Sequence, residues 1–132
     1  MKVGEYARTK NCNMPSLIGK IIKEEYMIPC NAEHKYIYLI DTKNNNVWFE
    51  EDNILKSSTN IMDLIEVGDF ITYKKGNMYI DIPYRVYGTY NEILEETELR
   101  IDDEYLKDIE ILSIVTHEQF ERMQYNLESE VN

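Results

Sequence analysis

The chain has 132 residues, of which 43% are hydrophobic and 30% are charged, and its formal net charge is −11 at pH 7. A chain of this size and composition is globular and forms one domain or two very small lobes. The acidic balance repels phosphate and disfavours direct nucleic-acid binding. No apolar run approaches the roughly 18 to 20 residues of a membrane span.

The chain start and the cysteine content indicate a cytoplasmic protein. Glu5 stands where a secretory leader would carry its apolar core, so no signal peptide is expected. Cys12 and Cys30 are too few for a disulfide scaffold. We therefore expect two reduced thiols in a protein that stays in the cell.

The first half of the chain is predicted to be strand-rich. Alternating and β-branched patterns predict strands in residues 3–9, 17–23, 35–40, 47–50 and 53–56. Residues 35–40 give the strongest strand signal in the chain, and the polar loop 44–46 joins them to residues 47–50 in a β-hairpin. Capping residues 57–60 then predict a brief helical turn around residues 61–65.

The second half continues with strands and ends in a helix. A hairpin is expected from residues 70–73 and 78–82, with an edge strand over 84–90 after Pro83 and a further strand over 108–115. Thr116 and Gln119 match the capping box, which predicts a helix over residues 117–125.

These elements predict a mainly β (α+β) fold with a C-terminal helix, in a single compact domain of residues 1–132. A weak internal echo leaves a second architecture open, because Val3-Gly4-Glu5-Tyr6 recurs as Val67-Gly68-Asp69-Phe70. Two SH3-like half-barrels would then form an N-terminal β lobe (1–66) and an acidic β lobe with the helix (67–132). Each glycine would turn the chain into the first strand of its half, and the acidic side chain would cap that turn.

The negative charge is concentrated in the second half. Residues 1–66 hold eight basic and ten acidic side chains, while residues 67–132 hold six basic and fifteen acidic ones. Nine carboxylates lie within residues 92–110, against Arg100 and Lys107: Glu92, Glu95, Glu96, Glu98, Asp102, Asp103, Glu104, Asp108 and Glu110. This acidic segment shows few core signals, and all of these carboxylates except Glu110 are candidate partner-binding residues.

Tyrosines form the second unusual feature. Of the eleven in the chain, five fall within residues 73–90. Strand propensity explains them as residues with one face in a small core. An interface explains them equally well, because tyrosine is enriched at binding hot spots. Tyr84 and Tyr87 are the candidates for contacts with a partner.

No residue pattern indicates catalysis, a metal or a cofactor. Neither His34 nor His117 belongs to a recognised catalytic signature. Cys30 and His34 have a spacing that could serve one metal, with Cys12 as a third ligand, but the short-spaced cysteine pairs typical of zinc sites are missing. The protein is therefore not expected to be an enzyme.

Three segments, residues 1–6, 60–70 and 111–121, share a pattern with known proteins. In these segments the chain resembles a family of short uncharacterised proteins encoded by phages and prophages of low-GC Gram-positive bacteria. The resemblance implies a genomic setting in which many small acidic proteins bind and inhibit host defence enzymes. No catalytic residue is attached to the matching segments.

Together these features lead to the hypothesis of a phage-encoded, anti-CRISPR-like inhibitor. Its acidic segment would act as a phosphate mimic in the basic groove of a host protein or ribonucleoprotein complex. One alternative is an accessory phage protein whose SH3-like modules bind another protein without inhibiting it. Another is a small metal-dependent enzyme.

Overall fold

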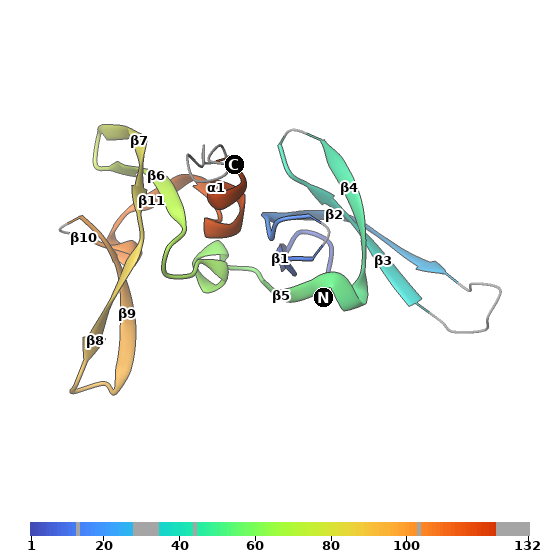
Figure 1. Cartoon of the computed structure of the whole chain (residues 1–132), viewed down its shortest axis with the longest axis horizontal. Helices are drawn as coiled ribbons and strands as arrows, with labels where there is room; N and C mark the ends of the chain where they lie inside the picture. The colour runs from blue at the N-terminus through green and yellow to red at the C-terminus, as the bar shows by residue number, and fades with distance from the viewer. Residues whose placement is uncertain (13, 28–34, 44, 103, 124–132) are drawn as a thin grey trace, which may run out of the picture.

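The computed structural model describes all residues except 13, 28–34, 44, 103 and 124–132 (Figure 1). In the described part, eleven strands form three antiparallel sheets, and one α-helix, α1 (His117–Met123), follows the last strand. The predicted mainly β fold with a C-terminal helix is confirmed. The strands are β1 (Tyr6–Thr9), β2 (Ile18–Met27), β3 (Lys35–Asp41), β4 (Asn46–Glu50), β5 (Ile54–Ser58), β6 (Phe70–Lys75), β7 (Met78–Arg85), β8 (Tyr87–Asn91), β9 (Glu96–Ile101), β10 (Glu104–Tyr105) and β11 (Glu110–Val115).

The first five strands form one sheet in the order β4-β3-β2-β1-β5. The predicted hairpin is present as β3 and β4, with Tyr38 opposite Phe49. A one-turn 3-10 helix, η1 (Glu51–Asn53), leads into β5. The predicted helical turn after β5 is a second 3-10 helix, η2 (Ile61–Leu64), and the Asn60 side chain caps it by accepting from the Met62 N–H.

The remaining strands form two three-stranded sheets, β11-β6-β7 and β10-β9-β8. The predicted hairpin of β6 and β7 is present, with Tyr73 opposite Ile80. Pro83 lies inside β7, which is an edge strand, as the missing proline N–H requires. The edge strand predicted over residues 84–90 is divided at Val86 between the end of β7 and β8.

The two halves of the chain share one strand order. In the first half, the part of β2 before Ile21 pairs with β1, and the part from Ile21 onward pairs with β3. In the second, β7 pairs with β6 before Val86, and β8 pairs with β9 after it. The third 3-10 helix, η3 (Leu106–Asp108), precedes β11 as η1 precedes β5. Thus β7 and β8 together occupy the place of β2, and β9, β10 and β11 occupy the places of β3, β4 and β5.

The turns that open the two halves are also alike. Gly4 and Gly68 have φ of 97° and 99°, a region that favours glycine. The Gly4 N–H donates to the Ile21 carbonyl, and the Ile21 N–H donates to the Glu5 carbonyl, both at 2.8 Å. In the second half, the Gly68 N–H donates to the Val86 carbonyl at 2.9 Å, and the Val86 N–H donates to the Asp69 carbonyl at 2.7 Å. The predicted glycine turns are therefore present, and the Asp69 side chain caps the second by accepting from the Glu66 N–H.

Each half has its own hydrophobic core. Ile21, Tyr38 and Ile40 are among the buried residues of the first core, and Ile71, Tyr73 and Ile101 are among those of the second. Figure 1 shows the two groups of strands on opposite sides of the molecule, with α1 between them. The division into lobes at residues 66 and 67 stays a prediction, although Ile65 packs in the second core.

The C-terminal helix begins with the predicted capping box. The Thr116 hydroxyl accepts from the Gln119 N–H at 3.2 Å, and the Gln119 side chain accepts from the Thr116 N–H at 3.1 Å. Phe120 stacks on Phe70 of β6, with ring centroids 4.2 Å apart. The end of the predicted helix, residues 124–125, lies outside the described residues. No described helix has the length and apolar run that a bilayer crossing needs.

One expectation about the second half is wrong. The acidic segment contributes strongly to the core: Ile101 and Leu106 are fully buried, and Leu99 and Ile109 pack against them. In β9 the charged residues alternate with apolar ones, so one face of the strand is buried although the segment is acidic overall.

Candidate functional site

A buried arginine joins the two halves of the molecule. Arg8 of β1 is fully buried and lies against the loop that precedes β6 and against α1. Its Nη1 donates to the Leu64 carbonyl at 3.0 Å. Its guanidinium contacts Asp69 and Glu66 from the second opening turn, and Glu118 from the first turn of α1.

Asp69 is the centre of this ionic junction, which we define as Arg8, Glu66, Asp69, His117 and Glu118. Its carboxylate accepts from both terminal nitrogens of Arg8, at 2.6 and 3.2 Å, a bidentate pair. It also accepts from the backbone N–H of Glu66 at 2.8 Å and of His117 at 2.9 Å. Both oxygens of this fully buried carboxylate are therefore satisfied, and Asp69 ties the turn, the helix and β1 together.

The two glutamates use the remaining side of the guanidinium. Glu66 Oε2 lies 2.7 Å from Arg8 Nε, but without the alignment of a hydrogen bond. Glu118 Oε2 lies 3.1 Å from Nη2. Burial of Arg8 opposes its charge, yet the hydrogen bond that it donates to Asp69 and the charges of Asp69, Glu66 and Glu118 outweigh this effect and raise the pKa of Arg8. The guanidinium stays charged at every ordinary pH.

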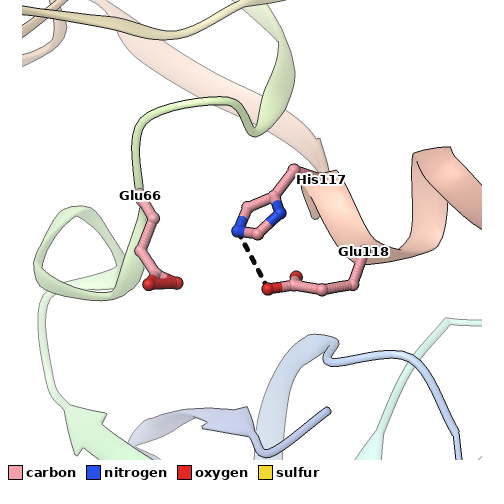
Figure 2. Close-up of side chains that lie close together, drawn as sticks. All are labelled: Glu66, His117 and Glu118. Atoms are coloured by element: carbon pink, nitrogen blue, oxygen red, sulfur yellow. Dashed lines mark ion pairs between the residues drawn. The ribbon is translucent and has the colours of Figure 1, made fainter.

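Figure 2 shows His117 beside these glutamates, with its ring between Glu66 and Glu118. His117 Nε2 lies 2.9 Å from Glu118 Oε1. One ligand atom each from Glu66, His117 and Glu118 lies within 4.8 Å of the others. The group thus offers an imidazole nitrogen and two carboxylate oxygens to one point, and these are types of ligand that divalent cations use in proteins.

The sequence analysis missed this junction. His117 was expected only as a residue of the helix, and the one histidine considered as a metal ligand was His34, with Cys12 and Cys30, where no metal was expected. Cys12 is an exposed free thiol, while Cys30 and His34 lie outside the described residues. The signal in the sequence was Arg8, a charged residue inside a predicted strand, and the structure buries it together with its neighbours Ala7 and Thr9.

The acidic segment is spread over several surfaces. Glu92 and Glu95 lie in the turn that joins β8 to β9, and Glu96 and Glu98 lie on β9. These four residues form the acidic part of the β8–β9 hairpin, which extends away from the rest of the molecule (Figure 1). Of the four, only Glu98 is partly buried.

The other carboxylates of the acidic segment lie elsewhere, and two of them are opposite lysines. Glu104 of β10 forms an ion pair with Lys75 of β6. Glu110 is opposite Lys74 in the pairing of β11 with β6. Asp108 lies in η3 and Asp102 in the turn after β9. Asp103 is outside the described residues. The structure therefore gathers only the four hairpin glutamates of the predicted set.

The tyrosines divide between the core and the surface. Tyr73 is buried, and burial raises its pKa, helped by the charge of Asp102. Tyr84 is exposed on β7, with its ring centroid 6.3 Å from that of Tyr73. Tyr87 is exposed on β8, where its hydroxyl donates to the Asp102 carbonyl. The core explanation holds for Tyr73, and the interface explanation stays a prediction for the exposed Tyr84 and Tyr87.

The tip of the hairpin carries two exposed aliphatic side chains that the sequence analysis did not single out. Ile93 is 92% exposed and Leu94 is 57% exposed. Among the described strands, β8 pairs only with β9, so the other edge of β8 keeps unpaired backbone groups. The hairpin thus combines carboxylates, apolar side chains and a free strand edge.

Comparison with known proteins adds no functional information: no family model, curated protein or solved structure matches the chain significantly. The two sites just described are therefore the basis of the functional argument.

Proposed function

We propose that the chain is a binding protein whose β8–β9 hairpin docks into a groove of a protein partner. The observation that carries the proposal is the hairpin tip, where Ile93 and Leu94 are exposed between Glu92 and Glu95. Isolated exposed aliphatic residues are common, but two at a projecting tip with carboxylates on both sides suit a groove with an apolar floor and a basic rim.

The partner that we infer is a nucleic-acid-processing complex of the host. This step rests on the resemblance to phage and prophage proteins together with the charge of −11. A groove that holds phosphates is rimmed by Lys and Arg, and carboxylates on the hairpin would be attracted to the same rim. The protein would then act as an anti-CRISPR-like inhibitor that competes with nucleic acid for one surface.

Charge spacing limits how closely the hairpin can imitate a nucleic acid. Glu96 and Glu98 are two residues apart on one strand, which separates them by about 6.8 Å. A strand of duplex DNA carries one charge per roughly 3.4 Å of axis. The β9 strand therefore has about half the charge density of one strand of DNA. The carboxylates accordingly serve mainly to speed association, and the apolar tip supplies most of the residence time.

The test is capture from a host lysate followed by kinetics on the captured protein. The paired substitution of Ile93 and Leu94 by Ser should abolish capture, whereas Leu55→Ser, at an exposed aliphatic of the first half, should not. The paired substitution of Glu92 and Glu95 by Lys should slow association at low salt more than at high salt. The same change at Glu51 and Asp52, exposed residues of η1, is the matched control.

Three further results decide the proposal. The captured protein should bind nucleic acid, and added nucleic acid should release it from the chain. Capture that is independent of the hairpin variants would refute the docking site. Capture through the hairpin of a protein with no affinity for nucleic acid would refute the inhibitory role.

The second candidate is an accessory phage protein that binds through SH3-like modules. The shared strand order of the two halves supports it, because each half places a 3-10 helix before its last strand. Binding would then use strand edges and the exposed Tyr84 and Tyr87 rather than the tip. Loss of capture in Tyr84→Ala or Tyr87→Ala but not in the tip variant would favour this candidate.

A further inference from the structure

We infer that the ionic junction is a binding site for a divalent transition cation, held by Glu66, His117 and Glu118. The site is independent of the hairpin and of the proposed function. It would tie α1 to the loop before β6, at the place where the two halves meet (Figures 1 and 2).

The first argument is the ligand set. His117 offers Nε2, and each glutamate offers a carboxylate oxygen. Imidazole with carboxylates suits Zn²⁺ and related first-row cations, whereas Mg²⁺ and Ca²⁺ prefer oxygen ligands alone. The ligands also come from two segments, since Glu66 precedes β6 and the other two begin α1. A cation there would therefore join segments about fifty residues apart in the chain.

The second argument is charge. The junction has three carboxylates and one permanent cation, so it carries a net charge of −2 while His117 is neutral. Asp69 already engages both terminal nitrogens of Arg8. Glu118 is only 13% exposed in its side chain, so water compensates its charge poorly. A divalent cation would balance the excess.

The third argument is geometry. Ligand atoms of a tetrahedral zinc site are separated by roughly 3.3 Å when metal–ligand distances are about 2.0 to 2.1 Å. His117 Nε2 and Glu118 Oε1 are already 2.9 Å apart, and all three ligand atoms lie within 4.8 Å. Glu66, with a side chain 39% exposed, has room to close the remaining gap of about 1.5 Å. A water molecule would complete the coordination, because His117 is 35% exposed and open to solvent.

The test measures Zn²⁺ binding by calorimetry and follows the thermal unfolding midpoint with and without metal. The wild-type protein should bind one Zn²⁺, and its midpoint should rise. His117→Asn and Glu66→Gln should each weaken binding at least about tenfold, which is the effect that even an outer-shell substitution has on metal sites. Mg²⁺ should not replace Zn²⁺.

Three control variants separate this site from other ligands. His34→Asn removes the other histidine, Cys12→Ser removes the exposed thiol, and Glu121→Gln removes an exposed carboxylate of α1. All three should bind Zn²⁺ as the wild type does. Binding that is lost with His34 or Cys12 but kept without His117 would overturn the proposal.

A measurement on the unmodified protein guards against variants that fail to fold. The imidazole nitrogen resonances of His117 should shift on addition of Zn²⁺ and return on chelation. Absence of Zn²⁺ binding in the wild type, or binding that leaves these resonances in place, would also overturn the site.

Discussion

Replacement of Asp69 by Asn tests the ionic junction most directly. The side chain keeps its shape and loses its charge, so the result isolates electrostatics and hydrogen bonding from packing. Asp69 accepts four hydrogen bonds in the native protein, two from Arg8 and two from backbone N–H groups. Asn has one acceptor oxygen, so it can satisfy only half of these donors, and its NH₂ group faces the rest.

The expected cost follows from those donors. A buried donor left without an acceptor costs about 1 to 3 kcal/mol, so two cost about 2 to 6 kcal/mol. Breaking a buried ion pair by removing one partner costs about 3 to 5 kcal/mol. Glu66 and Glu118 remain beside Arg8 and moderate the loss of charge. We expect the free energy of unfolding to fall by about 3 to 5 kcal/mol, which is a large share of the about 5 to 15 kcal/mol of a typical domain.

Urea unfolding followed by circular dichroism measures this effect. With a urea dependence of about 2 kcal/mol per M, the midpoint should fall by about 2 M. Asp81→Asn, at an exposed carboxylate of β7, is the control and should change stability by less than about 0.5 kcal/mol. A double-mutant cycle with Arg8→Met should give a coupling of at least about 1 kcal/mol. The reasoning fails if Asp69→Asn is as mild as Asp81→Asn.

Three further predictions concern single residues. Gly19→Ala should lower the free energy of unfolding more than Gly88→Ala does in urea titrations. The new Cβ at position 19 would lie 2.5 Å from the backbone oxygen of Asp41, which cannot move away easily, whereas at position 88 it would lie 2.6 Å from a methyl of the Thr97 side chain. Equal losses of stability would contradict this. The pKa of Tyr73 is raised by burial, so the folded protein holds the phenol proton more tightly than the unfolded chain does. Stability present below about pH 10 should therefore fall as the pH rises further, and Tyr73→Phe should flatten that decline in alkaline urea titrations. Thr116→Ala removes the helix cap and the hydrogen bond to the Ser16 carbonyl, so it should lower the free energy of unfolding by about 1 to 2 kcal/mol in the same assay. Thr116→Ser keeps the hydroxyl and should retain most of this stability.

Local structure could be predicted from the sequence where one short pattern determines it. The hairpin of β3 and β4 follows from alternating β-branched and aromatic residues, and the start of α1 follows from Thr116 and Gln119. The positive φ of Gly68 was also predictable, because only glycine adopts it without strain. In each case the residues that decide the structure lie within a few positions of one another.

The acidic segment shows why its core residues were missed. In β9, Leu99 and Ile101 flank Arg100, so half of the strand faces the core although its charge density resembles that of a solvated loop. Net charge over a window averages the two faces and hides the alternation. The same average suggested one acidic patch, whereas Glu104 pairs with Lys75 and only the hairpin glutamates remain together.

The ionic junction could not be predicted from any local pattern. Arg8 is 61 residues from Asp69 and 110 residues from Glu118. Only the arrangement of the two halves brings them together, and that arrangement depends on packing across the whole chain. An arginine at a core position of a strand is the one hint, since a buried guanidinium requires a carboxylate from elsewhere.

The sequence separations within the junction bear on how the protein is made. Ribosomes add about 5 to 20 residues per second, so Glu118 is synthesised roughly 5 to 20 seconds after Arg8. Asp69 is synthesised about halfway through this interval, since it is 61 residues from Arg8, so Arg8 first meets Glu66 and Asp69 and gains Glu118 only at the end. The first half has a hydrophobic core of its own, so its strands can pack early, whereas the junction that joins the two halves is complete only after synthesis of nearly the whole chain.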